Sequence, residues 1–128
     1  MNTKQVIVMR NDLNMRRGKQ IAQGAHASMK VLLDTQIARG NVGEVILKPT
    51  QAMLEWIDGI FTKICVSVNS EEELIAIYEK AKSLGIPTAI IKDSGLTEFN
   101  GVPTLTCVAV GPDYVDNVDM VTKGLPLL

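Results

Sequence analysis

Short apolar runs rich in β-branched residues alternate along this chain with longer stretches of helical periodicity. Runs of this length, bounded by Gly, Pro or polar residues, are typical of buried strands. They predict strands at residues 4–10, 61–68, 88–92 and 104–110. The Gly111-Pro112 pair is expected to stop the last strand, because both residues punctuate regular structure.

The segments between these runs predict helices over residues 18–39, 50–57, 70–83 and 113–122. Thr50 can cap the second helix, and Asn69 or Ser70 can cap the third. Three glutamates, at 71–73, follow that cap, where the helix macrodipole favours negative charge. Residues 40–50 contain two Gly and a Pro, which predicts a connection with a short extended piece at 45–47.

Strands that alternate with helices predict an α/β fold, a three-layer α/β/α sandwich around a mixed, mostly parallel four-stranded sheet. No helix separates the last two strands, so we expect that pair to be antiparallel. The 128 residues fit a single domain, 1–128.

Composition excludes several classes of protein. Hydrophobic residues make up 46% of the chain and charged residues 21%, which excludes a largely disordered protein. No apolar stretch is long enough for a membrane span, and the N-terminus lacks a signal-peptide pattern, so a cytoplasmic protein is expected. Cys65 and Cys107 lie in apolar runs without metal-ligand spacing, which predicts two buried thiols.

The charge is unevenly distributed along the chain. Residues 1–30 hold six basic side chains against one acidic, a net +5, whereas residues 31–128 hold seven against 13, a net −6. A basic pole of this kind can attract phosphate. Chance clustering on a solvated surface is the simpler interpretation of charge alone, because no long Lys/Arg block is present.

The first predicted helix carries the candidate chemistry. At 100° per residue, one side presents two amines, an amide and the only histidine: Lys19, Gln23, His26 and Lys30. The opposite side, expected to face the core, presents Ile21, Ala22, Ala25, Ser28, Met29 and Leu32. His26 could be a surface residue, a core residue with a satisfied ring or a general base. One histidine without neighbouring cysteines offers too few ligands for a metal, so none is expected.

A second candidate segment follows the third predicted strand. Asp93-Ser94-Gly95 and Thr97 leave the carboxyl end of that strand, where α/β sheets usually bind ligands. Asp93 could orient His26 or a water, although Asp-Ser-Gly is also a common turn. Thr106 offers a hydroxyl but is also a good strand residue. The sequence contains no phosphate-binding loop, dinucleotide fingerprint or nucleophile elbow.

Three blocks of sequence resemble the type 2, archaeal and eukaryotic type, peptidyl-tRNA hydrolase family. The first is Arg10-Asn11-Asp12-Leu13, Met15, Gly18-Lys19, Ala22-Gln23 and His26-Ala27. The second is Asp93, Gly95 and Thr97, with Thr106 in a strand that ends at Gly111-Pro112. The third is Val121-Thr122-Lys123-Gly124-Leu125 with Leu127-Leu128. The segment 34–56 does not match, and Leu96 stands where many members carry a basic residue.

The resemblance implies a hydrolase that cleaves the ester between a peptide and the terminal ribose of tRNA, without metal or organic cofactor. It also implies a possible homodimer. His26 would deprotonate the water with Asp93 holding its ring, while Lys19 would stabilise the oxyanion or bind the terminal phosphate. Substrate contacts fall to the remaining polar residues: Gln23, Thr97 and Thr106 for the ester and ribose, and Arg16, Arg17 and Lys30 for acceptor-stem phosphates.

Two alternatives stay open at this point. Asp93 with Thr97 is a competing catalytic pair. The unmatched segment and Leu96 also permit a different class of function, a non-catalytic tRNA- or protein-binding homologue on the same fold.

Overall fold

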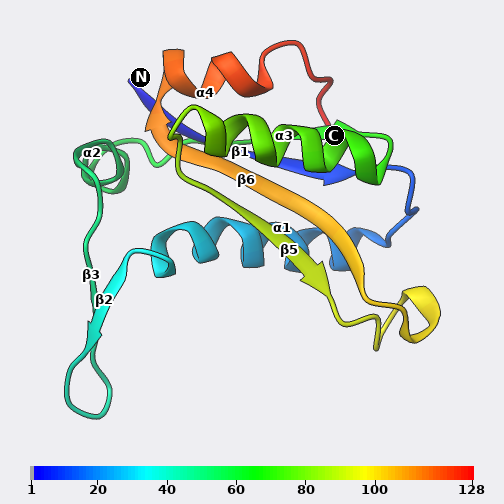
Figure 1. Ribbon diagram of the computed structural model, residues 1–128, viewed down its shortest axis with the longest axis horizontal. Helices are drawn as coiled ribbons and strands as arrows, with labels where there is room; N and C mark the ends of the chain where they lie inside the picture. The colour runs from blue at the N-terminus through cyan, green and yellow to red at the C-terminus, as the bar shows by residue number, and fades with distance from the viewer. Residues whose placement is uncertain (1) are drawn as a thin grey trace.

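The computed structural model describes residues 2–128 as two helical layers around one sheet (Figure 1). The site depends on three strands and one helix: β1 (Thr3–Arg10), α1 (Arg17–Leu33), β5 (Thr88–Asp93) and β6 (Thr104–Tyr114). The other elements are β2 (Gln36–Arg39), β3 (Val45–Leu47), α2 (Gln51–Asp58), β4 (Lys63–Val68), α3 (Glu71–Ser83), a helical turn at Phe99–Gly101 and α4 (Val115–Thr122).

The four-stranded sheet has the order β4-β1-β6-β5. The β1–β4 pair is parallel, and β6 pairs antiparallel with both β1 and β5. The mixed α/β sheet and the antiparallel last pair are therefore confirmed. Three strands run in one direction, but only one neighbouring pair is parallel, because β6 lies between β1 and β5.

Two separate cores confirm the three layers. Val6 and Val8 of β1 point to the face covered by α3 and α4, whereas Ile7 and Met9 point to the face covered by α1 and α2. This alternation follows from the two-residue repeat of a strand. In Figure 1, α3 and α4 lie above the sheet and α1 lies below it.

The predicted caps are also confirmed. The Thr50 side chain accepts a hydrogen bond from the Met53 N–H at 3.1 Å, and Ser70 accepts one from the Glu73 N–H at the same distance. Each hydroxyl satisfies one of the free N–H groups at its helix start. Gly85 follows α3 with φ +71°, a backbone conformation that favours glycine.

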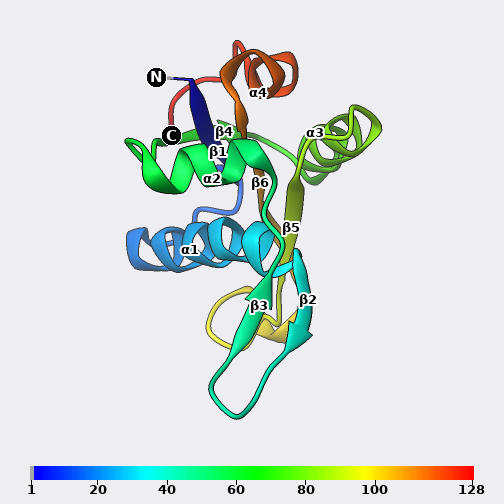
Figure 2. The ribbon, with the colours of Figure 1, turned by 90° about the vertical axis from the view of Figure 1, so that its left-hand side faces the viewer.

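The first helix is shorter than predicted, because residues 36–39 form a strand. The Thr35 hydroxyl and N–H both donate to the Leu32 carbonyl and end α1. Residues 36–39 then pair with β3 in a hairpin. The hairpin projects from the body of the molecule in both ribbon views (Figure 2).

The prediction of which side of α1 faces the core is wrong. Ile21 and Met29 are 67% and 60% exposed, and the buried residues of the helix are Gln23, Gly24, Ala27 and Val31. Two of them, Gly24 and Ala27, are small and let α1 lie close to the sheet; a Cβ atom at Gly24 would already touch Ile7 at 3.8 Å. The exposed apolar side instead lines a groove of about 530 Å³ next to β4.

Two further expectations need correction. The last strand does not stop at Gly111-Pro112 but continues to Tyr114, because a register shift opposite β1 accommodates the pair. Only Cys107 is buried; Cys65 is exposed because β4 is an edge strand, and both thiols are free. Within residues 2–128, none of the helices has both the length and the apolar character needed to cross a membrane.

Candidate active site

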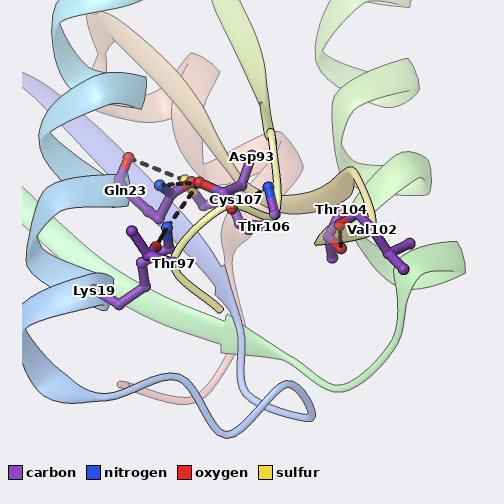
Figure 3. A network of polar contacts seen from close by, with 9 residues as sticks. Lys19, Gln23, Asp93, Thr97, Val102, Thr104, Thr106 and Cys107 are labelled. Atoms are coloured by element: carbon purple, nitrogen blue, oxygen red, sulfur yellow. Dashed lines mark hydrogen bonds and ion pairs between the residues drawn. The ribbon is translucent and has the colours of Figure 1, made fainter. Parts of the chain in front are cut away.

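Asp93 stands at the end of β5 and accepts three hydrogen bonds (Figure 3). Its Oδ1 accepts from Lys19 Nζ at 2.8 Å and from Gln23 Nε2 at 3.2 Å, and its Oδ2 accepts from the Gly95 N–H at 2.8 Å. The bond from Lys19 is the main cause that lowers the pKa of Asp93, against the opposing effect of burial. Asp93 is therefore a carboxylate at neutral pH.

Lys19 joins Asp93 to the loop that follows β5. Its Nζ donates to Thr97 Oγ1 at 2.7 Å and lies 5.9 Å from the centre of the Phe99 ring. An ammonium has three N–H groups, and within residues 2–128 only two of those on Lys19 are used. Because Thr97 accepts through its oxygen, its own hydroxyl hydrogen stays available as a donor. The free N–H of Lys19 and the free O–H of Thr97 therefore belong to two groups that contact each other.

Gln23 and Thr106 lie beneath this cluster and are buried, with exposed fractions of 2% and 0%. The Thr106 hydroxyl donates to Gln23 Oε1, which turns the amide nitrogen of Gln23 toward Asp93. The contact with ester and ribose expected of these two side chains stays a prediction. In this structure Gln23 contacts Asp93 directly, and Thr106 holds Gln23 in place from below.

Cys107 adds a further contact to this support. Its Sγ donates to the Gln23 carbonyl at 3.2 Å. Burial raises the pKa of Cys107 to about 12, so this group stays a thiol and not a nucleophilic thiolate.

Gly95 shapes the loop that carries Thr97. Its φ is +84°, and a Cβ atom at this position would lie 2.5 Å from the Val102 carbonyl oxygen. Only glycine fits both constraints. Asp93-Ser94-Gly95 is therefore a turn, and the same turn supplies the N–H that binds the Asp93 carboxylate.

His26 lies outside this network. It is exposed and makes no hydrogen bond within residues 2–128, so the expected contact between Asp93 and His26 is not formed. Asp93 meets α1 further toward its N-terminus, at Lys19 and Gln23. His26 instead lines a hollow between α1 and β5, together with Lys30 and Lys92.

The basic pole is largely neutralised by the fold. Five of its six cations pair with carboxylates: Lys4 with Asp119, Arg10 with Asp12, Arg16 with Glu98, Lys19 with Asp93 and Lys30 with Asp34. Four of these carboxylates, Asp34, Asp93, Glu98 and Asp119, belong to the acidic remainder of the chain, which therefore lies against this pole. The Arg16–Glu98 contact is long, at 3.8 Å, and Arg16 is 88% exposed, while Arg17 has no ion pair within residues 2–128.

The sequence-predicted cations thus separate into two groups. Arg16 and Arg17 mark the start of α1. Lys30 lies in the last turn of the same helix, about 20 Å away, given the rise of an α-helix per residue. The first turn of α1 contains no acidic residue, and its N-cap, Arg16, makes no side-chain cap. Free N–H groups and two guanidinium groups therefore meet at one end of the helix.

Several contributors to the site were not predicted. The Phe99 ring and the Cys107 thiol enter it through tertiary contacts with Lys19 and with the Gln23 carbonyl. The Gly95 N–H enters it through the local turn that the Asp-Ser-Gly pattern indicated. Residues 2–128 contain no group of three or more His, Cys, Asp or Glu side chains arranged to hold a metal ion.

We predict that Lys19→Met raises the pKa of Asp93, because the largest cause of its lowering is removed. A lowered carboxyl pKa contributes stability above its unfolded value, and this stability is lost as pH falls through the folded value, below 3.8. The difference in unfolding free energy between wild type and variant should therefore shrink in acid. Urea unfolding across the acid range measures it, with Lys82→Met as the control; a difference independent of pH would contradict the prediction.

The comparisons with known proteins identify the family of the chain. The family model described as "Peptidyl-tRNA hydrolase PTH2" matches residues 3–128. A peptidyl-tRNA hydrolase from Methanocaldococcus jannaschii is 43% identical over 98% of this chain and 99% of its own length. One from Sulfurisphaera tokodaii is 40% identical over 100% of both chains.

One solved structure supports the fold alone. A protein of unknown function from Agrobacterium tumefaciens strain C58 has a TM-score of 0.61 at 15% identity, covering 100% of this chain and 98% of that one. The family model and the relatives span nearly the whole chain, including the segment 34–56 that carries the hairpin and α2. The protein described here therefore belongs to the PTH2 family of peptidyl-tRNA hydrolases.

Proposed function

We propose that this protein hydrolyses the ester that links a peptide, or an N-blocked amino acid, to the terminal ribose of tRNA. The observation that carries the proposal is the Lys19 ammonium held between the Asp93 carboxylate and the Thr97 hydroxyl. Relatives named peptidyl-tRNA hydrolase favour this activity over a non-catalytic binding homologue. A cytoplasmic location, where tRNA is used in translation, is part of the proposal.

Ester hydrolysis places negative charge on the carbonyl oxygen in the transition state. The unused N–H of Lys19 and the hydroxyl of Thr97 are two donors that can bind this oxyanion. Asp93 keeps Lys19 fixed in position, so the donors need no reorganisation during the reaction. One preorganised donor of this kind typically contributes about 10²–10³ in rate.

The attacking water must also be oriented and lose a proton. Asp93 Oδ2 accepts only one hydrogen bond within residues 2–128, so a lone pair is open to a water. His26 is the second group that can accept the proton, because its ring has no partner within those residues. As proton acceptor, Asp93 would act within the hydrogen-bond network, whereas His26 would act from the neighbouring hollow between α1 and β5.

The tRNA would approach from the start of α1. Arg16, Arg17 and the free N–H groups of the first turn form an anion-binding end beside Lys19. The phosphates of the acceptor stem fit this end, because such contacts follow backbone shape rather than base sequence.

We predict that the purified protein releases tRNA from N-acetyl-aminoacyl-tRNA without added metal. Lys19→Ala and Asp93→Asn should each lower turnover about 10²–10⁴-fold, because they remove the donor and the group that fixes it. Release of tRNA is measured at saturating substrate, and Lys80→Ala on the opposite layer is the matched control. Absence of cleavage under any condition would instead favour the binding homologue.

The same assay assigns the proton acceptor. A loss in His26→Ala as large as in Asp93→Asn places the base on His26. Near-normal turnover of His26→Ala, at unchanged thermal stability, leaves that role to Asp93. Activity abolished by a chelator and restored by zinc would overturn the metal-free reaction.

We predict that Arg16→Ala with Arg17→Ala raises KM and flattens the salt dependence of binding by about one unit of slope per lost phosphate contact. Turnover at saturation should change little, because these charges bind substrate and transition state alike. A salt series compares this double variant with Lys80→Ala/Lys82→Ala, which removes the same charge from α3. Equal slopes in wild type and the Arg16/Arg17 variant would show that tRNA binds elsewhere.

A homodimer is also part of the proposal. The groove between α1 and β4 is lined by apolar side chains that are exposed to solvent in the isolated chain, among them Ile21, Met29, Phe61 and Leu128. Apolar surfaces of this kind on water-soluble domains mark interaction sites. A second copy of the chain would cover it.

We predict that wild-type protein sediments as a dimer and that Ile21→Glu shifts it toward monomer, because a charge would be buried at the interface. Ile75→Glu, on an exposed position of α3, is the matched control and should leave the dimer intact. Analytical ultracentrifugation over a range of concentrations measures both. A wild-type monomer at every concentration would contradict the prediction.

A further inference from the structure

A hollow of about 680 Å³ lies between α1 and β5, next to the candidate active site. Its α1 side includes His26, Lys30 and Leu33, and its β5 side consists of Ile90, Ile91 and Lys92. His26 is one helical turn beyond Gln23, which contacts Asp93. The hollow therefore continues directly from Asp93 along β5, in the direction opposite to the strand.

The outer edge of β5 has no partner strand within residues 2–128. β5 ends the sheet order, and β6 is the one strand of this part of the chain that pairs with it. The Pro87 carbonyl accepts from the Gly111 N–H of β6 at 2.7 Å. Because peptide groups alternate sides along an antiparallel strand, those of Ala89 and Ile91 face β6, while those of Thr88 and Ile90 face outward. Among the backbone hydrogen bonds made outside the helices and strands, within residues 2–128, none reaches the peptide groups of Thr88 or Ile90.

We propose that this edge binds the peptide part of peptidyl-tRNA as an added β-strand, an inference that rests on the function proposed above. The ester would lie at Asp93, so the peptide would extend from its carboxyl end at Asp93 back toward Thr88. The peptide and β5 would then run in the same direction, as a parallel pair. Main-chain hydrogen bonds would supply binding without reading the peptide sequence.

The surroundings favour a peptide over RNA in this hollow. Its walls include the apolar side chains of Ala25, Met29, Leu33 and Ile91. Lys30, one of its two lysines, is already paired with Asp34 at 3.1 Å. A ribose-phosphate chain cannot form a β-ladder, and the exposed guanidinium groups lie at the other end of α1. The ester would thus lie between the start of α1, which binds the tRNA, and the hollow along β5, which binds the peptide.

The geometry sets the peptide length that this edge can recognise. At about 3.3 Å per residue, the outward peptide group of Ile90 lies about 10 Å from Asp93, and that of Thr88 about 16 Å. A single N-blocked amino acid cannot reach either group. The gain in binding should therefore begin at about three residues and level off at about six.

The test is a series of N-acetylated oligoalanyl-tRNAs with one to eight alanines. We expect kcat/KM to rise about ten-fold between one and six residues, mainly through a lower KM, since net gains per backbone hydrogen bond are modest. In a six-residue substrate, N-methylation should reduce this gain at alternate residues only, because every second N–H of an added strand faces β5.

Each outcome separates this inference from the function on which it rests. Equal kcat/KM at every length, or an N-methyl effect without alternation, overturns the added strand and leaves the hydrolase intact. No cleavage of any member overturns the hydrolase and the inference together.

A protein variant supplies an independent measurement. Leu33→Gln places a polar group on the wall of the hollow, whereas Leu54→Gln makes the same change on α2; the two leucines are 45% and 42% exposed. Leu33→Gln should raise KM more for the six-residue substrate than for the one-residue substrate, and Leu54→Gln should raise neither. The same KM ratio for both substrates in Leu33→Gln would overturn the proposal.

Discussion

The ion pair between Lys19 and Asp93 is the contact on which the candidate site depends. It joins the first helix to the last edge strand, and its two side chains are largely shielded from water, at 13% and 11% exposure. Removing a charge from water is costly, and further hydrogen bonds to the pair offset part of that cost. Gln23 and Gly95 supply such bonds to the carboxylate, and Thr97 supplies one to Lys19. Breaking either partner leaves the other charge uncompensated, so the geometry of the pair is strongly constrained.

The first helix arranges three chemical environments along its length. Its start presents Arg16 and Arg17, its first two turns present Lys19 and Gln23 to Asp93, and its later turns face the open edge of β5. An ester substrate with a polyanion on one side and a peptide on the other has the same order. The helix can hold this arrangement because two small residues on its buried side, Gly24 and Ala27, let it pack closely on the sheet.

Signals carried by a few neighbouring residues were enough to predict most elements and the caps at Thr50 and Ser70. The sequence motifs also included Lys19, Gln23, Asp93 and Thr97, which lie together in the fold, but not the ion pair that joins Lys19 to Asp93. The core face of α1 was missed, since the larger apolar residues, such as Ile21, lie on the side that the sheet leaves uncovered. Strand order decides which charges meet and which cysteine is buried, and no local pattern in this chain specifies that order.

The central position of β6 has a consequence for how the site forms during folding. This strand lies between β1 and β5 and is the one that pairs with both. β5 therefore cannot join the sheet before β6 does, and Asp93, at the end of β5, takes its place beside Lys19 only with the completed sheet. The two charges are 74 positions apart in the sequence, so their contact closes a long loop of chain, whose entropic cost must be met by the rest of the sheet. A partly folded chain therefore lacks the ion pair, and the site forms together with the fold.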